Sequence, residues 1–188
     1  MDAGRLTEKL QEAFMAAQSL AKERHHQQLD VEHLLLELFE QEGGLAPRLL
    51  ELSGADKEKA ADWLRNQLRQ KPQVHGADGQ LYAAPALARL LEEAEAEAKR
   101  MQDEYISVEH VLLALPRGAE PVARQLASFG LTKEALVAAV RNVRGNQRVT
   151  SPHPEATYEA LSKYGRDLVA EVKAGKIDPV IGRDSEIR

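Results

Sequence analysis

The sequence contains no cysteine. Disulfide bonds, zinc sites built on thiolates and thiol nucleophiles are therefore excluded, and the chain suits a reducing cytoplasm. Aromatic residues account for only 4% of the chain, against 43% hydrophobic residues in total, so we expect an aliphatic core. Long apolar runs are also missing, because stretches such as residues 111–115 are far shorter than the roughly 18 residues of a membrane span. The charged N-terminus lacks the apolar segment of a secretion signal, and we expect a cytoplasmic protein without membrane contact.

An excess of positive charge is missing as well. The 188 residues include 25 Lys or Arg and 30 Asp or Glu, which gives a formal net charge of −5. A general nucleic-acid binder needs a surplus of basic side chains to contact phosphates, so we expect no nucleic-acid partner. Arg141, Arg144 and Arg148 form a small basic cluster. We interpret it as a favourable placement of cations at a helix C-terminus, not as an RNA contact.

A segment of eight residues occurs twice in the chain. Residues 31–38 read Val-Glu-His-Leu-Leu-Leu-Glu-Leu and residues 108–115 read Val-Glu-His-Val-Leu-Leu-Ala-Leu, so six of eight positions are identical at a shift of 77. Matches further downstream, such as Gly54 with Gly130, follow a shift of 76, which a one-residue difference in a loop explains. Such self-similarity indicates two copies of one structural unit.

Each copy carries the signals of four helices. Apolar residues recur at helical spacing, and polar residues stand where N-caps belong. The expected N-caps are Asp30, Asp56, Ser107 and Thr132. Proline near the start and glycine at the end mark the third helix of each copy, at Pro47 with Gly54 and at Pro121 with Gly130. We therefore predict an all-α fold of two pseudo-symmetric four-helix repeats, at about residues 1–75 and 80–145.

Two stretches with turn-forming residues divide the chain. Residues 71–79 separate the two repeats, and residues 146–154 are predicted to be a linker. One more amphipathic helix is expected at residues 155–174. The predicted organisation is a domain at residues 1–145, the linker, and the beginning of a second domain at residues 155–188.

Catalytic chemistry finds little support in the sequence. A phosphate-binding P-loop requires Gly-x-x-x-x-Gly-Lys-Ser/Thr. The Gly-Lys pair at Gly175 has Ala170 in place of the first glycine and Ile177 in place of the hydroxyl residue. A set of nucleophile, base and acid is not recognisable either. We therefore expect no catalytic residues and no enzyme activity in this chain.

Histidines are the possible metal ligands in the first copy. His25 and His26 are adjacent and point about 100° apart on a helix, and neither forms an i, i+4 pair with His33. We therefore expect no metal site. His33 and His110 occupy matching places in the two copies and are predicted to be packing residues.

Residues that break the internal symmetry are candidates for function. Asp103 stands where the first copy has His26, and Thr7 stands where the second copy has Ala84. Glu109 lies close to Asp103 in the sequence and is either an ordinary acid of a first helical turn or part of the same site. A purely structural role stays open for all three.

Several motifs resemble a known family. The doubled Val-Glu-His-x-Leu-Leu-x-Leu unit is similar to the N-terminal domain of the Clp ATPases. Residues 164–168 and 175–188, the latter with Asp-Pro-Val-Ile-Gly-Arg, resemble the opening of their first AAA+ ATPase module. Residues 18–21, 41–44 and 72–76 resemble the protein-disaggregase branch of the family.

The resemblance implies a double Clp N-domain, a linker and the truncated start of an AAA+ module. The full-length protein would be a homohexameric, ATP-driven chaperone of the bacterial cytoplasm, which uses ATP and magnesium and works with the DnaK system to disaggregate and thread misfolded proteins. Residues that match the border of the adenine site are Pro179, Val180, Ile181 and Gly182. That nucleotide site would be incomplete because the P-loop lies beyond Arg188, so no cofactor is expected in this chain.

The resemblance also implies a surface that binds unfolded or aggregated polypeptides weakly. Thr7, Asp103 and Glu109 fall at family positions implicated in recognition, and Leu91 and Tyr105 complete the predicted site. In an alternative interpretation, the domain docks a folded adaptor, as in ClpA- or ClpC-type unfoldases that feed a protease.

One departure from the family pattern changes the expected surface. Family members tend to offer apolar side chains near three positions that are occupied here by Glu93, Glu97 and His110. The apolar part of the groove is therefore expected to be smaller, or displaced toward Leu91, Met101 and Tyr105. Apolar side chains ringed by acids suit sequence-tolerant binding of unfolded segments.

Overall fold

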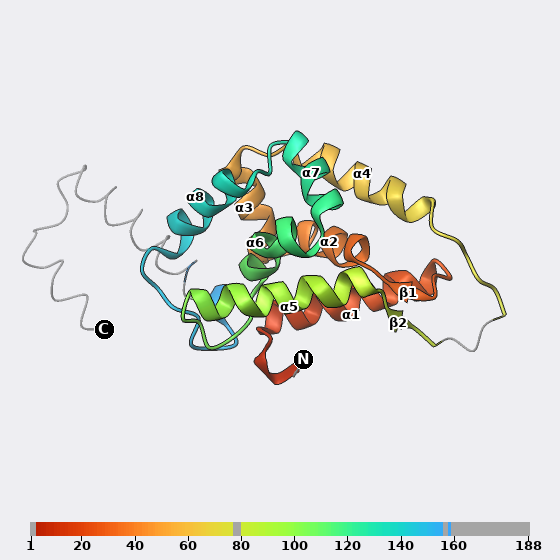
Figure 1. The fold of residues 1–188 in the computed structure, drawn as a ribbon, viewed down its shortest axis with the longest axis horizontal. Helices are drawn as coiled ribbons and strands as arrows, with labels where there is room; N and C mark the ends of the chain where they lie inside the picture. The colour runs from red at the N-terminus through yellow and green to blue at the C-terminus, as the bar shows by residue number, and fades with distance from the viewer. Residues whose placement is uncertain (1–2, 77–79, 156–157, 159–188) are drawn as a thin grey trace, which may run out of the picture. The chain divides into compact units, whose positions relative to one another are not determined.

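The computed structural model describes residues 3–76, 80–155 and 158 (Figure 1). The chain forms two compact units, Met1–His153 and Pro154–Arg188. Most of the second unit, which the sequence predicts to be the start of an AAA+ module, lies outside the described residues. So do the predicted adenine-bordering residues, which are Pro179, Val180, Ile181 and Gly182. All helices and strands named below belong to the first unit.

Helices dominate the described part of the chain. The first repeat contains α1 (Glu8–Glu23), α2 (Val31–Phe39), α3 (Leu45–Ser53) and α4 (Lys57–Arg69), after a short 3-10 helix at Ala3–Arg5. The second repeat contains α5 (Pro85–Arg100), α6 (Val108–Gly118), α7 (Glu120–Ser128) and α8 (Lys133–Arg144). The predicted all-α fold of two four-helix repeats is confirmed (Figure 1). Among the described helices, none has both the length and the apolar character that a membrane span requires.

The internal repeat is visible in the helix boundaries. Helices α1 and α5 each comprise 16 residues and begin 77 positions apart, at Glu8 and Pro85. Helices α4 and α8 begin 76 positions apart, at Lys57 and Lys133, as the sequence matches require. The predicted N-caps are confirmed at Asp30, Asp56, Ser107 and Thr132. Local sequence signals thus determine where these helices start.

Short parallel pairings join the two repeats. Strand β1 (Gln28–Leu29) pairs with β2 (Tyr82–Ala83), and Leu6 pairs with Ile106 in an isolated bridge. The bridge is the counterpart of the strand pair, because each of its residues is shifted by 77 positions from a residue of β2 or β1. In each repeat, the segment before the first helix therefore pairs with the segment before the second helix of the other repeat. The two repeats are joined by backbone hydrogen bonds at both places.

The core is aliphatic, as predicted. Helix α2 packs against α1 and α4, helix α6 packs against α5, and α3 contacts α8 across the two repeats (Figure 1). Apart from Phe39, the largest fully buried side chains are aliphatic: Leu10, Leu34, Leu35, Leu38, Leu49, Leu50, Leu64, Leu68, Leu87, Leu90 and Ile106. Burial of such side chains is the main favourable contribution to folding.

Gly118, near the end of α6, permits a close approach to α5. A Cβ atom at this position would lie 2.6 Å from the Cα atom of Leu90, which is too close for a backbone contact. We expect Gly118→Ala to lower the free energy of unfolding by about 1–3 kcal/mol, because the two helices must separate. Urea unfolding followed by circular dichroism measures the change. The exposed neighbour provides the control, Arg117→Ala, and equal stability of both variants would contradict the expectation.

Candidate functional site: a buried ionic cluster and an apolar cleft

Three of the predicted polypeptide-binding residues are buried. Thr7 is 0% exposed and caps α1, where its Oγ1 atom accepts a hydrogen bond from the N–H of Leu10 at 3.4 Å. The side chains of Asp103 and Glu109 are also 0% exposed. In this conformation none of the three presents its side chain to a ligand at the surface. Leu91 and Tyr105 are half-buried.

Asp103 is the centre of a buried ionic cluster, which we define as Asp103, Glu109, His110 and Arg144. The Arg144 guanidinium donates two hydrogen bonds to the Asp103 carboxylate, at 2.9 and 2.7 Å. The Nε2 atom of His110 donates a further bond at 2.6 Å, and the N–H of Val149 donates one at 2.9 Å. Burial by itself raises the pKa of this carboxyl, but the bonds from His110 and Arg144 outweigh it and lower the pKa of Asp103 to about 2.

His110 connects the cluster to the start of α6. Its Nδ1 atom accepts a hydrogen bond from the N–H of Ser107 at 2.8 Å, so the proton of the neutral ring is on Nε2 and points at Asp103. The equivalent His33 accepts a bond from the N–H of Asp30 at 3.0 Å. Both rings are 0% exposed, which confirms that they are packing residues of the repeat.

Glu109 is held less firmly than Asp103. Its Oε2 atom lies 3.4 Å from Nη1 of Arg144, and neither carboxylate oxygen accepts a hydrogen bond from the described residues. Two carboxylates therefore face one guanidinium inside the domain. The sequence interpretation of Arg144 as a helix-end cation omits this role, since the side chain is only 3% exposed.

Residues 146–153, which we call the exit segment, are the last residues of the first unit and contact its helices. The sequence predicts a linker here, after a domain that ends at residue 145. In the structure Val149 is fully buried and its carbonyl accepts a bond from the N–H of Glu104 at 2.8 Å. The carbonyl of Gln147 accepts from Arg144 at 2.8 Å, and that of Pro152 accepts from the N–H of Glu8 at 2.8 Å.

The first repeat has a counterpart of this cluster in which a histidine replaces the carboxylate of Asp103. His26, the counterpart of Asp103, accepts a hydrogen bond at Nδ1 from Nε2 of His33 at 2.8 Å. Helical spacing does not describe this contact, because α1 ends at Glu23 and the turn at His25, with a φ of 58°, brings His26 to His33. Lys71 provides the cation, 3.0 Å from Asp30. Among the described residues, no group of three or more candidate ligands is close enough to hold a metal ion.

The histidine pair makes stability depend on pH. Burial, together with the nearby His26 and Lys71, lowers the pKa of His33 to about 4 from the ordinary 6.5, and burial lowers that of His26 as well. The folded state therefore binds fewer protons than the unfolded state between these values. Stability is complete above about pH 6.5 and falls as the pH decreases toward 4.

We expect the free energy of unfolding to be about 1–2 kcal/mol lower at pH 5 than at pH 7.5, measured by urea unfolding. His33→Gln removes most of this difference, whereas His75→Gln, at an exposed position, keeps it. Equal unfolding free energies of the unmodified chain at the two pH values would contradict the proposed protonation.

The two cluster carboxylates differ in what their removal costs. Asp103→Ala leaves a buried guanidinium without its bidentate partner, and we expect a loss of about 3–5 kcal/mol in unfolding free energy. Glu109→Gln removes a charge that accepts no hydrogen bond from the described residues, and we expect a change within about 1 kcal/mol. Urea unfolding of both variants tests the difference, and an equal loss would show that Glu109 is as important to the fold as Asp103.

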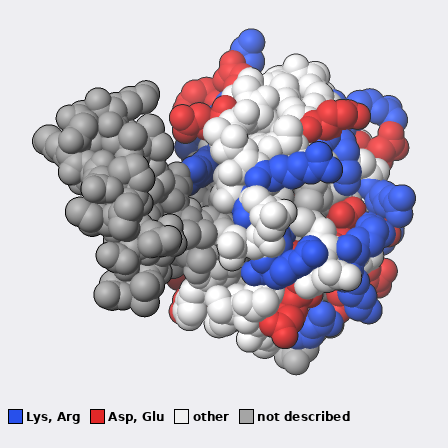
Figure 2. Space-filling model, turned by 90° about the vertical axis from the view of Figure 1, so that its left-hand side faces the viewer, with Lys and Arg blue, Asp and Glu red and all other residues white. Residues whose placement is uncertain are grey.

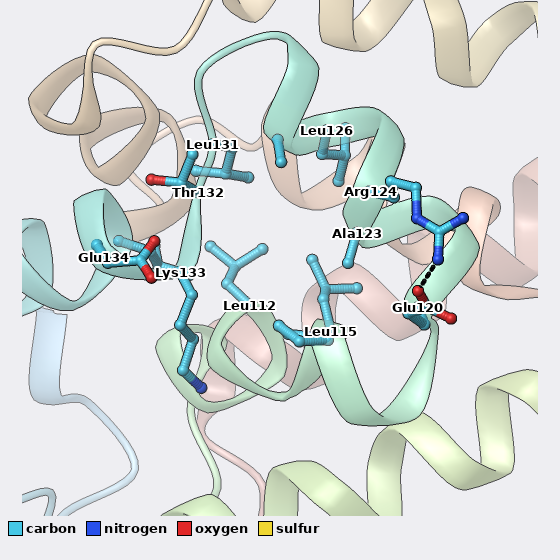
Figure 3. Close-up of a pocket in the computed structure, with 13 residues that line it drawn as sticks. Leu112, Leu115, Glu120, Ala123, Arg124, Leu126, Leu131, Thr132, Lys133 and Glu134 are labelled. Carbon is cyan, nitrogen blue, oxygen red and sulfur yellow. Dashed lines mark hydrogen bonds and ion pairs between the residues drawn. The ribbon is translucent and has the colours of Figure 1, made fainter.

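An apolar cleft opens between α6, α7 and α8 (Figure 3). Its volume is about 310 Å³, at the lower end of the range for ligand pockets. Aliphatic residues form its walls: Leu112, Leu115, Ala123, Leu126, Ala127, Leu131 and Leu136. At the rim lie an ion pair between Glu120 and Arg124, and the side chains of Lys133 and Glu134. None of the predicted polypeptide-binding residues lines this cleft.

The two repeats differ at a residue that lines the cleft. Pro116 lines it, and the residue 77 positions earlier is Phe39, which is fully buried at the end of α2. A proline is smaller than a phenylalanine and fills less of the space between helices. Sequence reasoning missed the cleft, although the exchange of Phe39 for Pro116 within the matched units was the available signal.

Charges of both signs lie on the surface and at the rim of the cleft. Figure 2 shows the side of the molecule on which α8 lies in Figure 1. On this side Lys and Arg side chains alternate with Asp and Glu side chains and with uncharged areas. Near the cleft, Nζ of Lys133 donates to the carbonyl of Leu113 at 2.7 Å and lies 3.6 Å from Glu97. The rim therefore offers partners for either sign of charge.

Comparison with known proteins places the chain in a family. Residues 5–129 match the Clp repeat (R) N-terminal domain, and the chain belongs to this family. Over its whole length it is 53% identical to the chaperone protein ClpB of Bacillus anthracis, of which it covers 22%. The chain thus spans about a fifth of the length of the curated relatives it matches. The predicted resemblance to the N-terminal region of ClpB is confirmed.

Solved structures share the fold. The Hsp104 N-terminal domain from Candida albicans has a TM-score of 0.70 at 18% identity, with 80% of this chain and 98% of that one covered. A complex of the ClpV N-domain with a VipB peptide has a TM-score of 0.60 at 20% identity, with 77% and 89% covered. At these identities the likeness shows the double four-helix architecture alone.

Proposed function

We propose that this chain is the polypeptide-recognition domain of an ATP-dependent Clp chaperone, and that it binds exposed apolar segments of non-native proteins. The observation that carries the proposal is the cleft between α6, α7 and α8, a hollow lined mainly by aliphatic side chains. Its volume of about 310 Å³ suits one or two apolar side chains of an incoming chain. The domain itself carries out no chemistry in this proposal.

The rim supports binding that tolerates many sequences. Glu120 and Arg124 lie on one side of the cleft and Lys133 and Glu134 on the other, so flanking charges of either sign find a partner (Figure 3). A peptide accompanies the ClpV N-domain in a solved structure of the same fold, which supports a peptide as the occupant. Affinity at one such small cleft is weak, and several copies in one assembly raise it through avidity.

The whole protein is proposed to be a homohexamer of the bacterial cytoplasm that uses ATP and magnesium in modules outside the described residues. It would thread misfolded proteins in cooperation with the DnaK system. Similarity to ClpB over the entire chain supports this assignment. Within the domain, the half-buried Leu91 and Tyr105 are proposed secondary contacts, whereas Thr7, Asp103 and Glu109 act from inside the fold.

A charge placed in the cleft tests the proposal. Ala127 lines the cleft and is half-buried, so Ala127→Asp introduces a carboxylate without disturbing a fully buried position. We expect at least tenfold weaker binding of fluorescently labelled casein, an unfolded protein, measured by fluorescence anisotropy. The matched control is Ala138→Asp on α8, which is exposed and does not line the cleft. Unchanged casein binding by Ala127→Asp would refute the cleft as the recognition site.

Docking of a folded adaptor is the second candidate, favoured by the shared fold of ClpV, whose N-domain is seen with a peptide of one defined protein. The same titration separates the two functions. Recognition of non-native chains predicts that casein competes with other unfolded proteins and that folded proteins do not compete. Adaptor docking predicts indifference to casein and a saturable complex with one folded partner.

A further inference from the structure

Two members of the buried ionic cluster, Asp103 and Arg144, form hydrogen bonds with the exit segment. Asp103 accepts the N–H of Val149, and Arg144 donates to the carbonyl of Gln147. Both groups therefore contact the backbone of the residues that leave the domain, in addition to each other. A cluster that served only to pack α5 against α8 would not need these bonds.

The exit segment buries little apolar surface of its own. Val149 is fully buried, but Asn146, Gln147, Arg148 and Thr150 are exposed. Its other attachments are polar: hydrogen bonds from Glu104 to Val149, from Glu8 to Pro152 and from Arg148 to the carbonyl of Met101, and an ion pair between His153 and Glu8. Segments with little buried apolar surface open locally at low free-energy cost while the core stays folded.

The buried residues Thr7, Asp103 and Glu109 all lie along this docking path. Asp103 binds Val149 directly, and Glu109 lies on the other side of Arg144. Thr7 caps α1 immediately before Glu8, whose N–H donates to Pro152. Their burial excludes direct contact with a ligand in this conformation, so a shared position beside the exit segment gives them a common role.

We infer that Asp103, His110 and Arg144 form a latch that holds the exit segment on the domain, and that the segment exchanges between a docked and a released state while the helices remain folded. Thr7 and Glu109 are positioning residues of this latch. When released, the eight residues 146–153 extend over at most about 25–30 Å. The latch thereby sets the length of the tether between this domain and the chain that follows residue 153.

Comparison with the first repeat shows which features of the latch belong to the second repeat alone. There the segment after α4 also returns to the turn after its first helix, through a bond from the N–H of Val74 to the carbonyl of His25 at 2.8 Å. However, Val74 is 37% exposed, and the position of Asp103 holds the neutral His26. Within the described part of the chain, only the second repeat combines a buried valine, a carboxylate and a buried arginine at this turn.

The test releases the segment by a substitution outside the cluster. Val149→Asp in the complete 188-residue chain places a carboxylate in a buried position next to Asp103, and Thr150→Asp adds the same charge at the exposed neighbour as a control. Amide hydrogen exchange at Glu104 and Glu8 reports docking, and exchange at Leu35 in α2 reports global stability. Trypsin cleavage after Arg148 provides a second readout.

We expect Val149→Asp to accelerate amide exchange at Glu104 and Glu8, and trypsin cleavage after Arg148, at least tenfold. The exchange rate at Leu35 should stay unchanged. Thr150→Asp should behave like the unmodified chain in all of these measurements. Asp103→Asn, which keeps the shape of the side chain, should shift the same readouts in the same direction. Retained protection at Glu104 and Glu8 in Val149→Asp would overturn the inference, as would equal acceleration at Leu35. No polypeptide ligand is needed, so the result is independent of the proposed function.

Discussion

The bidentate pair between Asp103 and Arg144 is the interaction on which the second repeat depends. Through it the end of α5, the end of α8, the cap of α6 at His110 and the backbone of Val149 meet in one buried place. A buried ion pair adds little net stability compared with apolar packing, but the loss of one partner is expensive. The pair therefore contributes mainly by fixing how these four parts of the chain are arranged, because both buried charges need their hydrogen-bond partners.

The internal symmetry makes the special features of each repeat recognisable. Both repeats use a histidine three residues after the helix cap to accept a backbone N–H, and the two differ in what that histidine contacts next. In the first repeat it is a second neutral histidine, and in the second repeat it is a carboxylate. Similarly, Phe39 is fully buried at the end of α2, whereas the matching Pro116 borders an open cleft. The repeats share a scaffold, and the proposed recognition and latching features both belong to the second one.

Local features of the structure were predictable from the sequence. Caps, glycine stops and helical periodicity act over a few residues, and they predicted the eight described α-helices, although not the short 3-10 helix at Ala3–Arg5. The partners of Asp103 were not predictable, because Arg144 and Val149 lie 41 and 46 positions away. Symmetry breaking singled out Asp103 correctly as unusual, but it does not distinguish a buried latch from a surface contact. The His26–His33 pair was missed because a turn, which helical spacing does not describe, brings the rings together.

The central claim is that polypeptides bind in the cleft while the ionic cluster stays inside the fold. A residue-resolved NMR titration of the chain with unfolded casein tests it most directly. The account predicts the largest amide shifts at Ala123, Ala127 and Lys133, which line the cleft, and none with a folded protein of similar size. Shifts centred on Thr7, Asp103 and Glu109, with the cleft residues unchanged, would contradict it.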